Sequence, residues 1–409
     1  MWRHDTTLKY FDDARRICRD AAGEIPDPHD AAKVASAGTV AATIRLARAD
    51  RRHAATVDQW DTDPSLLLTQ GSDAVAVDLR TGKHREPRRG DYFTKHTNAV
   101  SNGDCLLWLK FLDRVTAGDK ELQAYLRQVA GYNLTGSVRE HVVFFYYGTG
   151  ANGKGVFLNT LRGIWGPYAT VAPMELFLWS PYERHPTEKA HLRGARMVVS
   201  QEIGKGQRWD EAKLKQLSGG DPVSARYMRQ DFFEFMPQFK LNIAGNHKPS
   251  FHGVDEAIRR RIHLIPFTVT IPNNERDPDL AERLRAEWPG ILQWAIDGAI
   301  EYHRIRLAPP AVVTHATEAY LIEEDSFGRW VEECCVTGKF QWGRGDHLWG
   351  SWKAWGYSNN ELTGSRKAFA QTMEQHGFPP EKSQEVRGYR GIDMKPELKL
   401  KEHGQWDHQ

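Results

Sequence analysis

The chain has 409 residues, of which 40% are hydrophobic and 26% charged, a composition typical of globular proteins with two or three domains. The formal net charge is only +2, so the overall balance does not indicate a polyanion partner, and local basic clusters have to carry that argument. No apolar run reaches transmembrane length, the N-terminus lacks a signal-peptide core, and the four cysteines form no C-x-x-C pair, which argues against membrane proteins, disulfide scaffolds and structural zinc sites and favours a cytosolic protein with reduced thiols.

The N-terminal part predicts helices and one small hairpin. Residues 31–50 carry apolar side chains at helical spacing, and short alternating runs around the sequence RTGK are typical of a hairpin. Residues 101–136 return to a helical pattern, which Ser101 or Asn102 could cap. The apolar face predicted for that helix consists of Leu106, Leu109, Phe111, Leu112 and Val115. We assign residues 1–135 to a helical accessory domain.

Residues 136–308 alternate buried strands with helices, the pattern of an α/β domain built on a central sheet. In HVVFFYYGTGANGKG an apolar strand ends at Gly148, and a helix follows that ends before Gly166-Pro167. The helix carries Phe157, Leu158, Leu161, Ile164 and Trp165 on one face. A strand, a glycine-rich turn and a helix in this order direct backbone N–H groups and the positive helix end to one point, which suits a triphosphate.

The glycine-rich turn departs at one position from the P-loop pattern G-x-x-x-x-G-K-[ST]. Gly155 stands where a hydroxyl normally contacts Mg²⁺, and water can replace that hydroxyl because Mg²⁺ keeps several of its waters. Lys154 would still reach the β- and γ-phosphates. The predicted cradle for the phosphates of ATP consists of Gly148, Thr149, Gly150, Ala151, Asn152, Gly153, Lys154, Gly155 and Val156. A glycine-rich turn that binds nothing is the disfavoured alternative.

Three later features could complete a site for phosphoryl transfer. A short strand at 197–199 precedes Glu202, an acid that could polarise the attacking water. A second strand ends in Asn246, whose amide could orient that water, and three arginines at 259–261 precede a third strand. Taken singly, these features also fit a surface acid, a turn asparagine and a solvated helix end.

In their order along the chain, these features resemble the superfamily 3 helicases of viruses, phages and plasmids, in particular the phage/plasmid primase-helicase C-terminal type. The resemblance is carried by GTGANGKGVFLNTL, LRGARMVVSQEI, KQLSGGDPVSARYMRQDFFEFMPQFKLNIAGNHKP and GVDEAIRRRIHLIPF. It implies an AAA+-type P-loop core in which Lys154 contacts the phosphates, Glu202 is the catalytic acid and Asn246 is the sensor. Arg260 or Arg261 would be an arginine finger that acts across a subunit interface.

Two positions depart from the pattern of this family. Gly155 replaces the commoner serine or threonine, and Gln201 precedes Glu202 where many members carry an acidic pair. Both departures weaken the expectation of tight Mg²⁺ binding, so Glu202 is expected to hold the metal through water.

The resemblance also implies a hairpin that contacts DNA. The sequence PVSARYMRQDFFEF predicts two short strands around an exposed tip, and in the resembling helicases a hairpin here enters the channel of a hexamer and grips one strand. Arg226 and Arg229 could follow phosphates and Tyr227 could stack on a base, with Lys213 and Lys215 on the helix before them. The alternative is a basic surface hairpin with Tyr227 in the core.

The remainder predicts helices at 280–294 and 295–306, followed by a winged-helix-like domain over residues 309–409. Its sequence VRGYRGIDM reads as a hairpin whose Arg387 and Arg390 could contact duplex DNA. A lid or an oligomerisation module is the alternative for this domain.

Together these features predict a ring-forming helicase that uses ATP and Mg²⁺ and translocates on single-stranded or forked DNA, in the family's 3′ to 5′ direction. We expect a homo-oligomer, a hexamer by the resemblance, that serves phage or plasmid replication in the cytoplasm of a bacterial host. The family's primase half does not fit before residue 60, so the chain would be a fragment or would work with a separate primase or polymerase.

Two other functions stay open. The first is an ATP-dependent replication initiator that binds an origin with little unwinding, which Gly155 and Gln201 keep open. The second is a P-loop ATPase that acts on protein or packages DNA, which the helicase-like sequence QLSGGDPVSARYMRQ disfavours.

Overall fold

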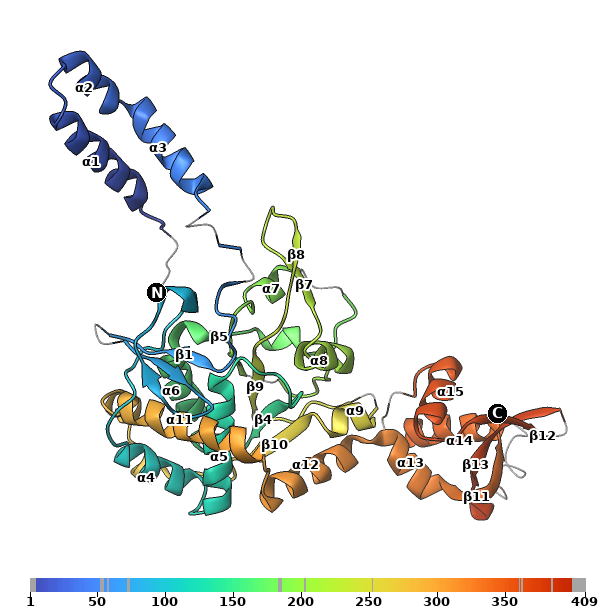
Figure 1. Cartoon of the computed structure of the whole chain (residues 1–409). Helices are drawn as coiled ribbons and strands as arrows, with labels where there is room; N and C mark the ends of the chain where they lie inside the picture. The colour runs from blue at the N-terminus through green and yellow to red at the C-terminus, as the bar shows by residue number, and fades with distance from the viewer. Residues whose placement is uncertain are drawn as a thin grey trace.

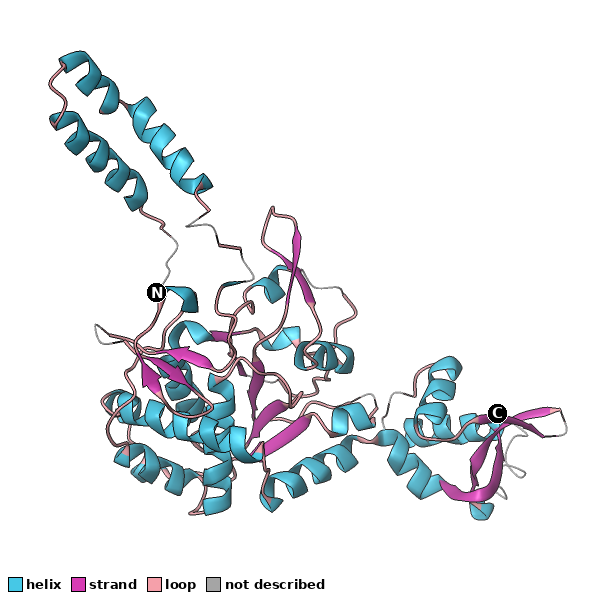
Figure 2. Ribbon diagram, viewed as in Figure 1, coloured by secondary structure: helices cyan, strands magenta, loops and turns pink. Residues whose placement is uncertain are grey.

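The computed structural model describes residues 5–51, 55–56, 59–71, 74–182, 186–201, 204–251, 253–359, 361, 363–383 and 385–398. A helical arm, a central α/β body and a small C-terminal domain follow one another along the chain, and the arm and the C-terminal domain project from different sides of the body (Figure 1). The strands of the body lie between layers of helices (Figure 2). No helix among the described residues is long and apolar enough to cross a membrane.

The body is built on a parallel sheet with the strand order β10-β4-β9-β6-β5. From one edge to the other, the strands are β10 (Ile262–Pro266), β4 (Val143–Tyr147), β9 (Lys240–Gly245), β6 (Met197–Gln201) and β5 (Ala169–Val171). Each adjacent pair is parallel, so the carboxyl ends of the strands share one edge of the sheet. The predicted α/β core is confirmed.

Helices cover both faces of this sheet, because successive side chains of a buried strand point to opposite faces and both sets are apolar. Phe144 and Tyr146 of β4 face one layer, and Val143 and Phe145 face the other. The first layer contains α4 (Leu106–Val115), α5 (Lys120–Leu134), α6 (Lys154–Trp165), α10 (Leu280–Arg285) and α11 (Trp288–Ile305). The second contains α7 (Thr187–Ala190), α8 (Glu211–Ser218), α9 (Glu256–Arg259) and α12 (Ala311–Glu324).

The first 135 residues divide between the arm and the body. The arm consists of α1 (Lys9–Gly23), α2 (Pro28–Val34) and α3 (Ala37–Ala49), which pack around Ala14, Cys18, Val40 and Ile44. The antiparallel strands β1 (Leu66–Leu68), β2 (Ala76–Asp78) and β3 (His84–Arg85) follow, and β2 and β3 form the predicted hairpin. Helices α4 and α5 share the core of the body through side chains such as Trp108 and Tyr125.

Helix α4 starts later than the sequence predicts, and a distant carboxylate caps it. The two carboxylate oxygens of Glu287 accept hydrogen bonds from the backbone N–H groups of Leu107 and Trp108, at 2.8 Å each. Ser101 and Asn102 are therefore not the cap. Leu106 and Leu109, predicted to be buried, are 71% and 43% exposed, because Trp108 occupies the buried face instead.

The helix boundary predicted after residue 294 is also wrong. Helix α10 ends at Arg285 and α11 runs from Trp288 to Ile305. Pro289 explains this position, because proline fits the first turn of a helix but lacks the N–H that the helix interior requires.

The C-terminal domain packs helices against an antiparallel sheet with the order β11-β13-β12. Its elements are α13 (Ser326–Cys334), β11 (Cys335–Arg344), α14 (Gly345–Ser358), α15 (Arg366–Gln375), β12 (Pro380–Ser383) and β13 (Val386–Met394). VRGYRGIDM is a single strand, and the hairpin joins it to β12. The core of the domain includes Phe327, Trp330, Trp352, Trp355 and Phe369.

Candidate functional site

The glycine-rich turn lies between the end of β4 and the start of α6. Gly150 and Gly153 have φ angles of +114° and +83°, which side chains other than glycine rarely adopt. A Cβ on Gly148 would lie 2.1 Å from the carbonyl oxygen of Phe267, so this position has no room for a side chain. The turn leads into the N-terminus of a 12-residue helix, where unpaired N–H groups and the positive helix end favour an anion.

Lys154 is the first residue of α6 and lies inside this turn. Its Nζ donates to the carbonyl oxygen of Gly148 at 2.6 Å, to Oδ1 of Asn152 at 3.2 Å and to Oδ1 of Asn246 at 3.1 Å. The side chain is buried, and this burial lowers the pKa of the ammonium group to about 8. All three acceptors are neutral, so a phosphate oxygen would be a stronger partner for the ammonium group.

The carboxyl ends of β4, β9 and β6 are neighbours, because β9 lies between the other two strands. Tyr147 of β4 is paired with Gly245, and Gln201, the last residue of β6, is paired with Ala244. Asn246 follows β9 directly and reaches Lys154. The structure therefore brings these two predicted site residues into contact, whereas Glu202 lies outside the described residues and its role stays a prediction.

Asn152 stabilises the glycine-rich turn through a contact that the sequence did not indicate. Its side chain is 4% exposed, and Nδ2 donates to the carbonyl oxygen of Phe267 at 3.0 Å. The amide N–H of Ile271 donates to the carbonyl oxygen of Ala151 at 2.8 Å. The segment after β10 thus braces the glycine-rich turn across a separation of 115 residues, and no local pattern marks such a contact.

The structure leaves open space around Gly155. A Cβ at this position would meet nothing within 4 Å, and the backbone is not left-handed. We expect Gly155→Ser to keep the ATPase activity predicted from the sequence within about twofold of wild type and to lower the Mg²⁺ concentration needed, because the hydroxyl offers a metal ligand at little steric cost. A titration of ATPase rate against Mg²⁺ measures both effects.

Gly153→Ala is the matched control in the same turn. Its Cβ would lie 2.6 Å from Val115 Cγ1 and 2.9 Å from Phe111 Cε2, at a positive φ, so we expect lost activity and a lower melting temperature. If the Gly155→Ser protein is stable but inactive, the expectation that serine is tolerated at position 155 is wrong.

The predicted arginines lie at the other end of β10 from the turn. Arg260 and Arg261 precede Ile262, which pairs with Val143 at the start of β4, whereas the turn follows Tyr147. A strand rises about 3.3 Å per residue, so these ends are at least ~13 Å apart. Arg260 is exposed, whereas Arg261 is 7% exposed and donates to the carbonyl oxygen of Ala257 at 2.7 Å. Neither arginine is close to the turn of its own chain.

The predicted hairpin is present as β7 (Val223–Arg226) and β8 (Phe232–Phe235), and it projects from the body (Figure 1). Arg229 lies at its exposed tip with a φ of +58°. Tyr227 is half-buried and stacks on Phe233, with ring centroids 5.2 Å apart. The guanidinium of Arg226 lies over the ring of Phe232 at 5.1 Å.

The two lysines predicted to join this hairpin are engaged elsewhere. Lys213 forms an ion pair with Asp210 of its own helix start at 2.9 Å, and Lys215 forms one with Asp255, the N-cap of α9. Their carboxylate partners reduce the positive charge that either lysine presents to DNA.

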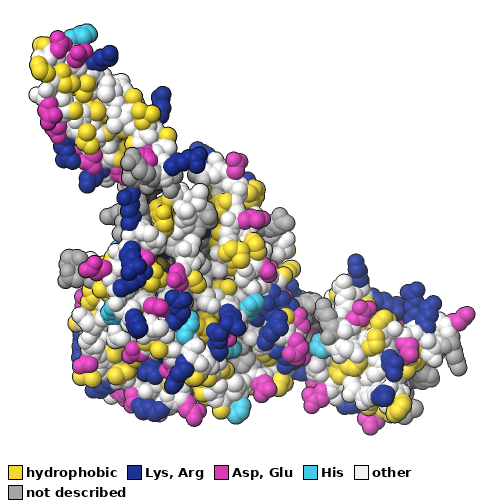
Figure 3. Space-filling model, viewed as in Figure 1, with side chains coloured by type: hydrophobic (Ala, Val, Ile, Leu, Met, Phe, Trp, Pro, Cys, Tyr) yellow, Lys and Arg dark blue, Asp and Glu magenta, His cyan; other side chains and the backbone are white. Residues whose placement is uncertain are grey.

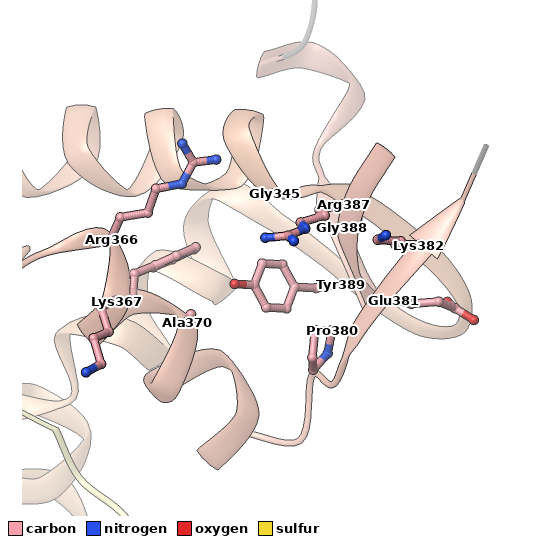
Figure 4. Close-up of a pocket in the computed structure, with 11 residues that line it drawn as sticks. Gly345, Arg366, Lys367, Ala370, Pro380, Glu381, Lys382, Arg387, Gly388 and Tyr389 are labelled. Atoms are coloured by element: carbon pink, nitrogen blue, oxygen red, sulfur yellow. The ribbon is translucent and has the colours of Figure 1, made fainter. Parts of the chain in front are cut away.

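Basic side chains also surround a hollow of about 700 Å³ in the C-terminal domain (Figure 4). Arg366 and Lys367 come from the first turn of α15, Lys382 from β12 and Arg387 from β13, with Tyr389 at the centre. Arg390 is not among the described residues that line this hollow, since side chains at odd separations on a strand point to opposite faces. Lys and Arg side chains gather over the same domain in Figure 3.

The described residues contain no ready-made cluster for the expected Mg²⁺ site. Among the described residues, no group of three or more His, Cys, Asp or Glu side chains could hold a metal ion. The glycine-rich turn itself fits a nucleotide whose metal is held largely by phosphate oxygens and water, because Gly155 supplies no ligand. Mg²⁺ therefore stays a prediction, with Glu202 as the expected contact through water.

Two family models match parts of the chain. Residues 1–117 match the family described as "D5 N terminal like". Residues 146–261 match the "Family of unknown function (DUF5906)". The second match extends from β4 to Arg261 and so contains the glycine-rich turn, β6, the hairpin, β9 and the arginines.

Several curated relatives carry helicase names. The chain is 29% identical over 249 residues to "Putative helicase 022R" of Frog virus 3 (isolate Goorha), an alignment that covers 55% of this chain and 25% of the relative. It is 25% identical over 241 residues to "Putative helicase 121R" of Invertebrate iridescent virus 3, covering 56% and 25%. The chain thus spans about a quarter of the length of these relatives. It is similar in sequence to viral proteins named as helicases.

A solved structure described as "The A form apo structure of NrS-1 C terminal region-CTR" is similar to most of the chain. The superposition has a TM-score of 0.48 at 10% sequence identity and covers 87% of this chain and 91% of that one.

Proposed function

We propose that this chain is an ATP-dependent DNA helicase of the superfamily 3, AAA+ type that acts as a ring in the replication of a virus or mobile element. The observation that carries the proposal is the contact between Lys154 and Asn246 at the carboxyl ends of adjacent parallel strands. In open α/β sheets, ligands bind at this edge of the strands. The helicase names of the viral relatives support the same function.

The chemistry proposed for the site is ATP hydrolysis. The glycine-rich turn and Lys154 would hold the β- and γ-phosphates, while Asn246 and Glu202 would position and polarise the attacking water. Mg²⁺ would neutralise phosphate charge when bound. Lys154 donates a hydrogen bond to Asn246 at 3.1 Å. A nucleotide that binds the lysine would therefore change the hydrogen bonding of Asn246, the residue proposed to orient water.

The ring is proposed from the position of the arginines. Arg260 is exposed at the end of β10 that lies away from the turn, so within one chain it is too far from the phosphates to stabilise their transition state. In a head-to-tail ring, each subunit presents one surface to a different surface of the next, so a ring can place the Arg260 surface of one subunit against the turn of its neighbour. We therefore propose Arg260, rather than the buried Arg261, as the finger.

The β7–β8 hairpin is the proposed contact with single-stranded DNA. Arg229 holds a left-handed backbone at its tip, which costs a non-glycine residue about 1 kcal/mol, and its exposed guanidinium can reach a phosphate. Tyr227 stacks on Phe233, so in this arrangement its ring supports the hairpin, and Arg229 is the stronger candidate for DNA contact.

We expect Arg229→Ala to weaken single-stranded DNA binding and to reduce the slope of log affinity against log salt by about 0.7, the contribution of one phosphate contact on a single strand. Fluorescence anisotropy with a labelled oligonucleotide over a range of salt concentrations measures both quantities. Lys120→Ala, which removes an exposed cation at the start of α5, should leave the slope unchanged. An unchanged slope in Arg229→Ala would remove this arginine from the phosphate contacts.

The proposed function is tested by strand separation on a forked duplex, together with ATPase rates with and without single-stranded DNA. A helicase separates the fork only with hydrolysable ATP, and single-stranded DNA stimulates its ATPase. ATPase activity that does not respond to DNA, with no strand separation, would contradict the proposal.

The second candidate is an ATP-dependent initiator that binds origin DNA and unwinds little. The basic hollow of the C-terminal domain favours it, because Arg366, Lys382 and Arg387 come from three separate elements and converge on one surface. The domain's order of helices and antiparallel strands also supports the predicted winged helix. Assembly on duplex DNA that requires ATP, without unwinding, would select the initiator over the helicase.

A further inference from the structure

Helix α9 is tied down at both ends by ion pairs, and the proposed finger Arg260 directly follows it. At its start, Nζ of Lys215 contacts Oδ2 of Asp255. At its end, Nη2 of Arg259 lies 3.0 Å from Oδ2 of Asp325. Between these two anchors the helix is only four residues long, so the backbone that carries Arg260 is linked to the partners of both pairs.

Both aspartates make a second bond that fixes their carboxylates. Oδ1 of Asp255 accepts a hydrogen bond from the N–H of Ile258 at 2.9 Å, and Asp255 thereby caps α9. Oδ1 of Asp325 accepts one from the N–H of Gly328 at 2.9 Å and caps α13. Each carboxylate therefore joins a helix start to a basic side chain from another part of the chain. Because the carboxylate is already held by its cap bond, less side-chain entropy is lost in the pair than in a lone exposed ion pair.

The anchors come from the two parts of the chain proposed to contact DNA. Lys215 lies on α8, which ends at Ser218 and leads after four residues into β7 of the hairpin. Asp325 is 6% exposed and lies at the junction of α12 and α13, where the C-terminal domain begins. Helix α9 thus connects the root of the hairpin, the finger and the C-terminal domain.

We infer that Lys215 and Asp325 are positioning residues for Arg260, and that they set the finger in the neighbouring subunit's site according to whether the hairpin holds DNA. This inference rests on the proposed function. It gives Lys215 a role different from the direct DNA contact expected from the sequence, since its ammonium group is committed to Asp255. A finger acts on the transition state, so the loss of its alignment lowers kcat and leaves ATP binding unchanged.

The test compares variants of the full chain for ATPase kinetics and single-stranded DNA affinity. For Lys215→Gln we expect kcat in the presence of saturating DNA to fall about tenfold, with KM for ATP and DNA affinity unchanged, because only transition-state alignment is lost. Lys215→Arg, which can still pair with Asp255, should restore most of kcat. Asp325→Asn should lower kcat in the same way, since asparagine keeps the cap of α13 but loses the ion pair with Arg259.

Lys120→Gln is the matched control, because it breaks another lysine–aspartate pair, with Asp113, away from α9. It should leave kcat unchanged. If Lys215→Gln weakens DNA binding and leaves kcat unchanged, the lysine contacts DNA directly and the inference is wrong. Unchanged kcat in both Lys215→Gln and Asp325→Asn would also overturn it.

Failure of the proposed function would be visible before any variant is compared, as a wild-type protein whose ATPase does not respond to DNA. Melting temperatures separate alignment from folding: an alignment role predicts that Lys215→Gln and Asp325→Asn lose kcat at a melting temperature close to that of wild type. Losses of kcat that follow the loss of thermal stability across both variants would assign the pairs to folding and overturn the inference.

Discussion

In the Lys154→Ala variant we expect ATP turnover to fall by at least about 10²-fold, the usual cost of removing one preorganised donor from a transition state that gains negative charge. Strand separation on a forked duplex should be lost with it. The ammonium group is placed by Gly148, Asn152 and Asn246, and no methyl group at this position could replace its charge. Steady-state hydrolysis and fork unwinding by wild type and variant measure the two losses.

The same substitution should leave the fold intact. No carboxylate among the described residues pairs with Lys154, so its removal leaves no buried anion without a partner, the usual cause of large destabilisation when an ion pair is broken. A melting temperature close to that of wild type is therefore expected, and it separates lost chemistry from lost structure. Strand separation that survives in Lys154→Ala would rule out the ATP-driven mechanism.

The pH dependence of ATP affinity is a second test of the role of Lys154. Burial lowers the pKa of Lys154 to about 8, and a bound triphosphate raises it, because the charged form is then favoured. ATP affinity should therefore be greatest below about pH 8 and decline by up to about tenfold per pH unit above it, as binding must take up a proton. Lys154→Arg, which stays charged over this range, should abolish that decline.

The parts of the candidate site whose positions follow from the sequence depend on local patterns and on strand order. An apolar strand, glycines and a helix face locate the turn, and parallel pairing then places the end of β9 beside it, which brings Asn246 to Lys154. The burial of a tryptophan cannot be predicted in the same way, because it depends on neighbours from other elements. The structure buries Trp108 and Trp209 fully and leaves Trp179 51% exposed.

The contacts that the sequence missed join residues far apart in the chain. Glu287 caps α4, Asn152 binds the carbonyl group of Phe267, and Lys215 pairs with Asp255. In each case the local sequence pattern predicts the helix or turn that contains the polar side chain. The pattern does not indicate which residue of another element that side chain contacts. Basic residues were accordingly assigned to DNA from their charge, although a carboxylate partner can neutralise that charge within the protein.

Arg260→Ala is expected to lower DNA-stimulated ATP hydrolysis by about 10³-fold, the scale of an arginine finger in phosphoryl transfer. Arg260 is exposed, so the variant should melt close to wild type. Arg261→Ala should behave differently, because it removes a buried side chain that donates to the carbonyl oxygen of Ala257, and its main effect should be a lower melting temperature. Hydrolysis rates and thermal melts of the two variants distinguish the arginines.

A mixture of two inactive variants tests whether Arg260 acts on a neighbouring subunit. Lys154→Ala subunits keep a working finger, and Arg260→Ala subunits keep a working phosphate turn, so a head-to-tail ring of both contains complete sites at some of its interfaces. In an equal, random mixture about a quarter of the interfaces join the right pair of surfaces, so ATP hydrolysis should recover to about that fraction of wild type. Recovery requires an interface between subunits, because the strand register of β10 and β4 keeps Arg260 at the opposite end of the sheet from its own turn. A mixture as inactive as its components would show that the finger does not act across subunits and would remove the argument for a ring.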